Sequence, residues 1–247
     1  MPRRTLILST VTCLTIFVMA CAVFAQQRQA PAAGQEGQRG GGQRAGAAAR
    51  VTRAPLFFRE EWKSQGAESP VDANRAVANP NLELKLYGPT GKEILITGNT
   101  GDENNPVHLW TGMCTSPCAF TLRDKANFAD LTGLARIKMV TKTSGYHKVH
   151  PVVKLADGTM LVGDREEGSP VDWLESDISV SDLKWRKMDP ERAVTTGDWV
   201  NSPNLSKVDE IGFVDLMPGS GHGQGGWSDV GKIEVYAKQV KREGAAN

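Results

Sequence analysis

The sequence predicts an all-β protein whose folded part is a single antiparallel β-sandwich. Apolar and polar residues alternate with a period of two in many short segments, as at Leu82, Leu84 and Leu86. Clusters of Gly, Pro, Asn and Asp interrupt the chain about every eight to twelve residues. No long segment shows helical periodicity, although 124–131 and 190–194 could each form one helical turn. Many short strands separated by turns are typical of a sandwich or a barrel.

The individual strands follow from the same alternation. The segment Ala156-Asp157-Gly158 predicts a tight hairpin turn between two of them, because Asp-Gly pairs readily adopt the positive φ angles that such turns need. The expected strands are 57–62, 82–86, 93–97, 107–112, 119–123, 135–141, 148–155, 160–162, 172–179, 183–187, 208–216 and 232–240.

The N-terminus predicts export. The chain begins Met-Pro-Arg-Arg, continues with an apolar run over 6–25 and places Val-Phe-Ala directly before Gln26. This pattern is typical of a signal peptide, here 1–25. Two alternatives stay open: the apolar run is long enough to be retained as a membrane anchor, and the sequence V-M-A-C loosely matches a lipobox that would lipidate Cys21. All three predict that the rest of the chain is periplasmic or secreted.

A polar linker is predicted at 26–55. It is rich in Gln, Gly, Ala and Arg, so it cannot bury enough apolar surface to offset the entropy of ordering. We therefore expect a disordered spacer there, a sandwich domain at 56–242 and a disordered tail at 243–247. The formal net charge is +1 for the chain, −1 without the leader's two arginines, and −5 without the linker's five arginines and one glutamate as well. Nucleic acid is not an expected partner of such a mildly acidic domain.

Two of the four cysteines lie outside the leader and are close together in the sequence. They form Cys114-Thr-Ser-Pro-Cys118, which in an oxidising compartment predicts a disulfide that closes a short turn. A zinc half-site that includes His108 is the alternative, but the exported part has no second cysteine pair to complete it.

The second half of the chain contains four strand-like segments in a recognisable order. They are L-A-R-I-K (134–138), W-R-K-M (185–188), L-S-K-V-D-E-I-G-F (205–213) and I-E-V-Y (233–236). In this order they resemble the galactose-binding-like jelly rolls, and among these the bacterial carbohydrate-binding modules and the CIA30-like domains. The resemblance covers about 130–241. It implies that the sandwich is a jelly roll, and fold similarity alone does not fix function.

The same resemblance implies a possible structural calcium ion. In jelly-roll carbohydrate modules the calcium ligands come from near the first and last strands. The nearest candidates in this sequence are Glu60, Glu61 and Asp229. No other cofactor is expected.

A glycine-rich segment at 218–229, P-G-S-G-H-G-Q-G-G-W-S-D, is the strongest candidate for a ligand-binding edge. The expected strands on either side of it predict a rigid frame for a loop that carries His222, Trp227 and Asp229. Aromatic rings stack on sugars while carboxylates and amides bind their hydroxyls. Trp110 and Tyr146 are further candidate platforms. Burial of the tryptophans in the core, and an exposed His222 without a special role, remain the alternatives.

Signatures of catalysis are missing from the sequence. It has neither the G-x-S-x-G nor the H-E-x-x-H pattern, and the glycine-rich segment lacks the G-K-[ST] ending of a phosphate loop. The leading hypothesis is an exported, non-catalytic sandwich that binds carbohydrate or a cell-envelope glycan. The alternatives are a carbohydrate-active hydrolase on a jelly-roll or concanavalin-like scaffold, and an envelope assembly or scaffold protein. Contact with a membrane is expected only if Cys21 is lipidated or the leader is retained.

Overall fold

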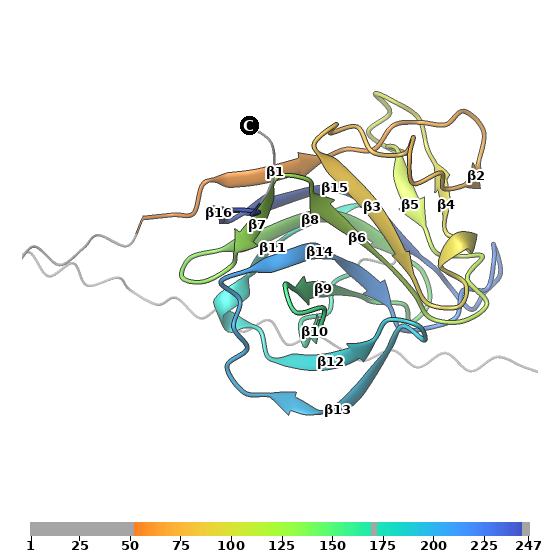
Figure 1. The fold of residues 1–247 in the computed structure, drawn as a ribbon. Coiled ribbons are helices and arrows are strands. Elements are labelled where there is room, and N and C mark those ends of the chain that lie inside the picture. Colours follow the sequence, from red (N-terminus) through yellow and green to blue (C-terminus); the bar gives the residue numbers. More distant parts are fainter. Residues whose placement is uncertain (1–51, 169–171, 244–247) are drawn as a thin grey trace, which may run out of the picture. The chain divides into compact units, whose positions relative to one another are not determined.

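Two antiparallel sheets face each other in the computed structural model, which describes residues 52–168 and 172–243 (Figure 1). Sheet A has the strand order β11-β8-β15-β5-β4-β2, with β1 also paired to β15. Sheet B has the order β13-β12-β10-β9-β14-β6-β3, with β7 beside β14 and β16 beside β7. The prediction of an all-β antiparallel sandwich is confirmed. The leader, the linker up to residue 51 and the tail from residue 244 lie outside the described residues.

The described residues contain sixteen strands and two short 3-10 turns, η1 and η2. No helix in this part of the chain is long and apolar enough to span a bilayer. The bounds are β1 Leu56–Glu60, β2 Ser69–Pro70, β3 Leu82–Tyr87, η1 Gly91–Glu93, β4 Leu95–Thr97, β5 His108–Trp110, β6 Cys118–Asp124, β7 Asn127–Asp130, β8 Arg136–Thr143, β9 Val149–Leu155, β10 Met160–Gly163, β11 Leu174–Ser179, η2 Val180–Asp182, β12 Trp185–Asp189, β13 Val194–Val200, β14 Val208–Asp215, β15 Ser228–Tyr236 and β16 Lys238–Lys241.

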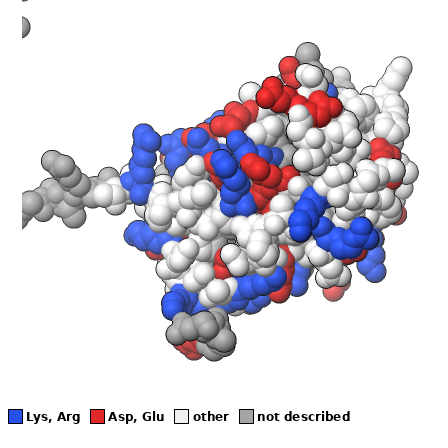
Figure 2. All heavy atoms as spheres, turned by 90° about the horizontal axis from the view of Figure 1, so that it is seen from above, with Lys and Arg blue, Asp and Glu red and all other residues white. Residues whose placement is uncertain are grey.

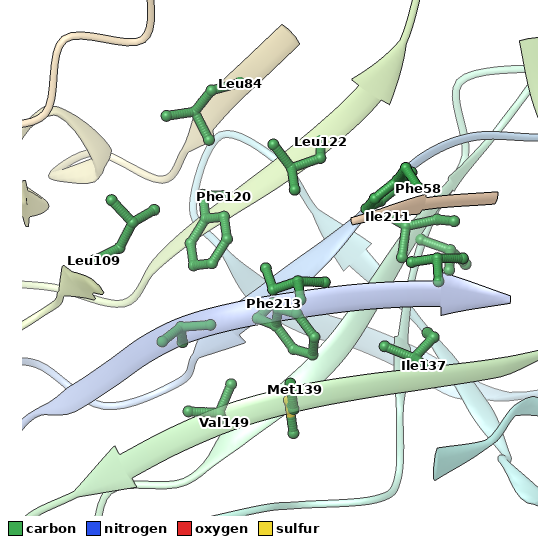
Figure 3. Packing of buried hydrophobic residues seen from close by; sticks show 14 of the residues in the cluster. Phe58, Leu84, Leu109, Phe120, Leu122, Ile137, Met139, Val149, Ile211 and Phe213 are labelled. Carbon is green, nitrogen blue, oxygen red and sulfur yellow. The ribbon is translucent and has the colours of Figure 1, made fainter. Parts of the chain in front are cut away.

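The main hydrophobic core fills the space between the two sheets (Figure 3). Strand β8 shows how the sequence builds it, because buried and half-buried residues alternate along its whole length. From β8, Ile137 and Met139 point toward Phe120 and Phe213 of sheet B, whose ring centroids are 6.1 Å apart. Burying one such side chain contributes about 1.5–3 kcal/mol to folding.

Local patterns misjudged two segments of sheet B. The segment 124–131, expected to contain a helical turn, contains the whole of β7, which pairs with β16 and with one residue of β14. The segment 190–194 is the hairpin turn that leads from β12 into β13, rather than a helical turn. In both places, pairing with a distant or neighbouring strand outweighs a weak local preference. The hairpin predicted at Ala156-Asp157-Gly158 is confirmed, since it joins β9 to β10.

The strands on either side of the glycine-rich segment do not lie side by side. Strand β14 belongs to sheet B, whereas β15 lies in sheet A between β8 and the pair β1 and β5. The glycine-rich loop therefore crosses from one sheet to the other at the end of the sandwich. This corrects the expectation of a frame made by two neighbouring strands, and it places the loop beside β5.

Charged side chains cover the half of sheet A's outer face that lies away from this loop. Ion pairs run across the strands, from Arg59 to Glu234, from Lys232 to Glu175 and from Arg136 to Asp177. The Lys232–Glu175 and Arg136–Asp177 pairs are partly exposed, so each contributes about 0–1 kcal/mol, whereas the Glu234 side chain is only 6% exposed. Positively and negatively charged side chains are interspersed on the face shown in Figure 2.

Cys114 and Cys118 form a disulfide in the structure, with Cα atoms 6.3 Å apart. The carbonyl of Cys114 also accepts the N–H of Gly219 at 2.7 Å, so the bridged turn braces the start of the glycine-rich loop. We expect replacement of both cysteines by serine to lower the free energy of unfolding by about 2 kcal/mol, the chain-entropy value for so short a loop. Urea unfolding of the oxidised protein and the variant measures this. Two free thiols in the denatured, unreduced protein would contradict the disulfide.

Candidate functional site

A row of side chains on the outer face of sheet A begins the candidate site. Asp229 in β15 is directly paired with Trp110 in β5 on one side and with Lys142 in β8 on the other. Directly paired residues share one face of a sheet. Leu109, next to Trp110 in the strand, is a core residue, so the row faces outward. His108 lies two residues before Trp110 and faces the same way.

Three aromatic side chains from loops surround this row. Trp227 lies edge-on to Trp110 with ring centroids 6.3 Å apart, and Trp173 lies edge-on to His108 at 5.0 Å. His222 stacks on Trp110 at 4.7 Å, with 25° between the ring planes. Together with the row they line an open pocket of about 200 Å³, and the other lining residues are Glu68, Thr97 and Asn105. Trp173 and Trp227 are half-buried, so both keep ring surface available to a ligand.

Asp229 has the most strongly perturbed carboxyl group in the pocket. Its side chain is only 7% exposed, and Oδ1 accepts no hydrogen bond from the described residues. Burial raises the pKa of Asp229 to about 7, although Lys142 and a hydrogen bond from Trp227 act in the opposite direction. This carboxyl can therefore take up or release a proton near neutral pH. A buried carboxyl with a shifted pKa beside an open pocket is typical of a functional site.

His108 faces this carboxyl, with 3.5 Å between its Nε2 and Oδ1 of Asp229. Its Nδ1 lies 2.7 Å from the carbonyl oxygen of Pro106, which assigns the neutral ring as the tautomer that donates from Nδ1. Burial lowers the pKa of His108, and the charge of Lys142 lowers it further. A neutral His108 therefore presents a bare Nε2, which can accept a hydrogen bond from protonated Asp229 or from a ligand hydroxyl.

A second buried aspartate, Asp215 at the end of β14, forms hydrogen bonds with residues at the base of the loops around the pocket. Its Oδ2 accepts hydrogen bonds from the hydroxyls of Ser228 at 2.8 Å and Thr111 at 3.0 Å, and lies 2.6 Å from Nδ1 of His147. Its Oδ1 accepts the N–H of Met217 at 3.0 Å. These partners belong to the β5–β6, β8–β9 and β14–β15 connections. The cluster is thus a scaffold for the site rather than part of its binding surface.

The structure brings together four of the five residues that the sequence suggested as ligand contacts. Trp110, His222, Trp227 and Asp229 all line the pocket on sheet A. Tyr146 stands on the β8–β9 loop, beside the glycine-rich loop, and is 85% exposed. It does not line the pocket.

The three carboxylates suggested as calcium ligands do not meet. Glu60 is 1% exposed, and its carboxylate accepts three backbone N–H groups, those of Trp62, Ala78 and Asn79. Glu61 is exposed, and Asp229 lies in the pocket. Among the residues that the structure describes, no group of three or more His, Cys, Asp or Glu side chains could hold a metal ion. The three side chains are therefore not gathered into one set of ligands, and the carboxylate of Glu60 caps the loop after β1.

Lys142 and His108 are pocket residues that the sequence did not single out as ligand contacts. Lys142 is one of the outward-facing residues of an alternating strand, and nothing local distinguishes it from Lys138. In the sequence, His108 is a candidate only for the alternative zinc half-site with the cysteines. The signal that could have identified them is the pairing register of β5, β15 and β8, which brings them to Asp229.

Comparisons with known proteins find only distant likenesses. No protein-family model and no curated protein matches the chain. The family 11 carbohydrate-binding module of the cellulosomal cellulase Lic26A-Cel5E of Clostridium thermocellum is 14% identical, and the match covers 71% of this chain and 97% of that chain with a TM-score of 0.40. An exo-beta-agarase is 12% identical over 72% of this chain and 26% of that chain, with a TM-score of 0.38. Arcelin-5, a lectin-like defense protein from Phaseolus vulgaris, is 9% identical over 71% of this chain and 100% of that chain, with a TM-score of 0.31. These are weak likenesses of fold, and no conclusion about a ligand is drawn from them.

Proposed function

We propose that this protein is an exported, non-catalytic carbohydrate-binding sandwich that takes a sugar unit of a glycan into the pocket on sheet A. The observation that carries the proposal is the combination of two half-buried indoles, Trp173 and Trp227, with the hydrogen-bonding side chains on the strands beside them. Export rests on the leader at 1–25. An exported domain meets cell-envelope or environmental glycans, so we infer these as its partners.

Each part of the pocket fits one property of a sugar ring. The indoles offer apolar, π-rich surfaces to its C–H groups. Asp229 and His108 offer acceptors, or a donor when Asp229 is protonated, and Lys142 offers a donor, so hydroxyl groups find partners of both kinds. At about 200 Å³ the pocket is smaller than the roughly 300–1,000 Å³ typical of drug-sized ligands. This size favours one sugar unit, such as a chain end or a side branch.

Replacing Trp227 by Ala tests the proposal. We expect the affinity for the preferred oligosaccharide to fall about tenfold to a hundredfold, because a stacked aromatic side chain contributes on the order of 1.5–3 kcal/mol. Titration calorimetry against a panel of oligosaccharides measures the affinity. Thermal melting of the same variant should change little, because the Trp227 ring is only half-buried.

Tyr146→Ala is the matched control, since it removes an exposed aromatic ring close to the loop but outside the pocket. Its affinity should equal that of the wild type. Unchanged binding in Trp227→Ala, or an equal loss in both variants, would rule out this pocket as the sugar site.

Acid-assisted hydrolysis of a glycoside is the second candidate function. One observation favours it: the pKa of Asp229 is raised to about 7, which suits a general acid near neutral pH. Glu68 is the other carboxylate that lines the pocket. Incubation with the oligosaccharides that bind, followed by an assay for new reducing ends, separates the two functions. Release of product that is lost in Asp229→Asn would establish the hydrolase.

A further inference from the structure

Trp110 is an unusual tryptophan, because it lies on the outer face of a sheet and is nevertheless only 2% exposed. It does not belong to the main core between the sheets. Its indole packs against Gly112 so closely that a Cβ at position 112 would come within 2.1 Å of Cζ2. Its Nε1 is buried and has no hydrogen-bond partner among the described residues. Buried indole N–H groups usually have a partner, whereas this edge of the Trp110 ring lies against Gly112.

A single side chain, His222, stacks over the ring of Trp110. The two rings are nearly parallel, with centroids 4.7 Å apart. The His222 side chain is 76% exposed, and its other near neighbours are Glu68, 4.0 Å from Nε2, and Trp227, edge-on with ring centroids 6.3 Å apart. Little besides these ring contacts therefore holds the imidazole in place.

The backbone that carries His222 is better fixed than its side chain. Gly219 donates to the carbonyl of Cys114 at 2.7 Å, and Gly221 donates to the carbonyl of Gly112 at 2.8 Å. The hydroxyl of Ser220 accepts the N–H of Gly226 at 2.7 Å and closes the loop. The imidazole can thus leave Trp110 by rotation about its side-chain bonds, without any movement of the loop.

We propose that His222 is a built-in plug, which occupies the stacking position on Trp110 and is displaced by the ring of the bound sugar. The proposal rests on the proposed function and adds to it the primary stacking surface of the site. In the free protein the imidazole covers Trp110 as the flat face of a sugar would. When the sugar enters, it takes over the stack on the face of Trp110. His222 then opposes binding, although its position in the pocket suggests a contact residue.

The sign of the effect of His222→Ala tests this role. We expect the variant to bind the preferred oligosaccharide about two- to tenfold more tightly than the wild type, because the stack no longer has to be broken. Gln224→Ala, an exposed substitution in the same loop, is the control and should bind as the wild type does. Weaker or unchanged binding in His222→Ala would overturn the plug and leave His222 as a contact or as a bystander.

A second measurement needs no ligand and keeps the test decisive if no sugar in the panel binds. Hydroxyl-radical labelling with readout by peptide mass reports the accessibility of each tryptophan. Trp110 should be labelled slowly in the wild type and in Gln224→Ala, and several-fold faster in His222→Ala. Faster labelling without any sugar binding would refute the proposed function and leave His222 only as a cover of Trp110, whereas unchanged labelling would refute the plug itself.

Discussion

At about pH 9, Asp229→Asn is expected to be more stable than the wild-type protein by up to about 4 kcal/mol. Folding raises the pKa of Asp229 from 3.8 to about 7, because the carboxyl is buried beside aromatic rings. Each unit of a pKa shift corresponds to about 1.36 kcal/mol. Asparagine has nearly the same shape and carries no charge, so it removes the cost of burying a carboxylate.

The raised pKa of Asp229 makes the free energy of unfolding of the wild type depend on pH in a defined way. Below about pH 4 the carboxyl is protonated in both the folded and the unfolded chain, and the two proteins should differ little. Between about pH 4 and 7 the folded wild type holds a proton that the unfolded chain has released, so its stability falls as the pH rises. Above about pH 7 the difference from Asp229→Asn should stay constant.

Urea unfolding of both proteins across this pH range measures the profile. Asp198→Asn is the control, because Asp198 is exposed on the edge strand β13 and its replacement removes no buried carboxyl group. An Asp229→Asn variant that is less stable than the wild type at high pH would mean that the carboxylate has a strong partner in the folded protein. That outcome would also remove the raised pKa as an argument for hydrolysis.

A carboxyl group that destabilises the fold is expected at a binding site, because a side chain there is selected for its contact with a ligand rather than for stability. Asp229 lies in line with Trp110 and Lys142, and its Oδ1 is directed at no hydrogen-bond donor of the described residues. A ligand hydroxyl would supply that donor. The proposed sugar binding and the cost of burying Asp229 would thus be two consequences of one arrangement.

The sequence predicted the strands of the core well and the exposed edge strand poorly. In β8 the alternation of buried and half-buried residues is complete, so the period of two is visible in the sequence. In β13 nearly all residues are exposed or half-exposed and Gly197 interrupts the strand, so no alternation marks it. Strand β7 is short, and its main pairing partner is β16, which lies far away in the sequence.

Prediction of the site reached the residues of the glycine-rich loop but not their surroundings. Trp227 and Asp229 are close together in sequence and next to turn residues, so a local reading suggests them. Lys142 and His108 join them only through the register of three strands, and no local pattern encodes that register. The stacking of His222 on Trp110 depends on the same register and on the crossing of the loop between the sheets.

The same substitution at Asp215 is expected to have the opposite effect: Asp215→Asn should lower the free energy of unfolding by about 1–3 kcal/mol, the cost of leaving a buried donor without a partner. The Oδ2 atom of Asp215 accepts hydrogen bonds from two hydroxyl groups and lies 2.6 Å from Nδ1 of His147. The side chains of Asp215 and His147 are each 1% exposed. An amide has one acceptor oxygen fewer and adds two N–H donors, so at least one buried donor loses its partner.

Urea unfolding of Asp215→Asn at about pH 9, compared with Asp229→Asn under the same conditions, measures two isosteric changes at buried aspartates. Stabilisation in one and a large loss in the other would show that hydrogen bonding, rather than burial, separates a structural carboxylate from one held for a ligand. If Asp215→Asn stayed within about 1 kcal/mol of the wild type, the cluster around Asp215 would not be the scaffold of the pocket.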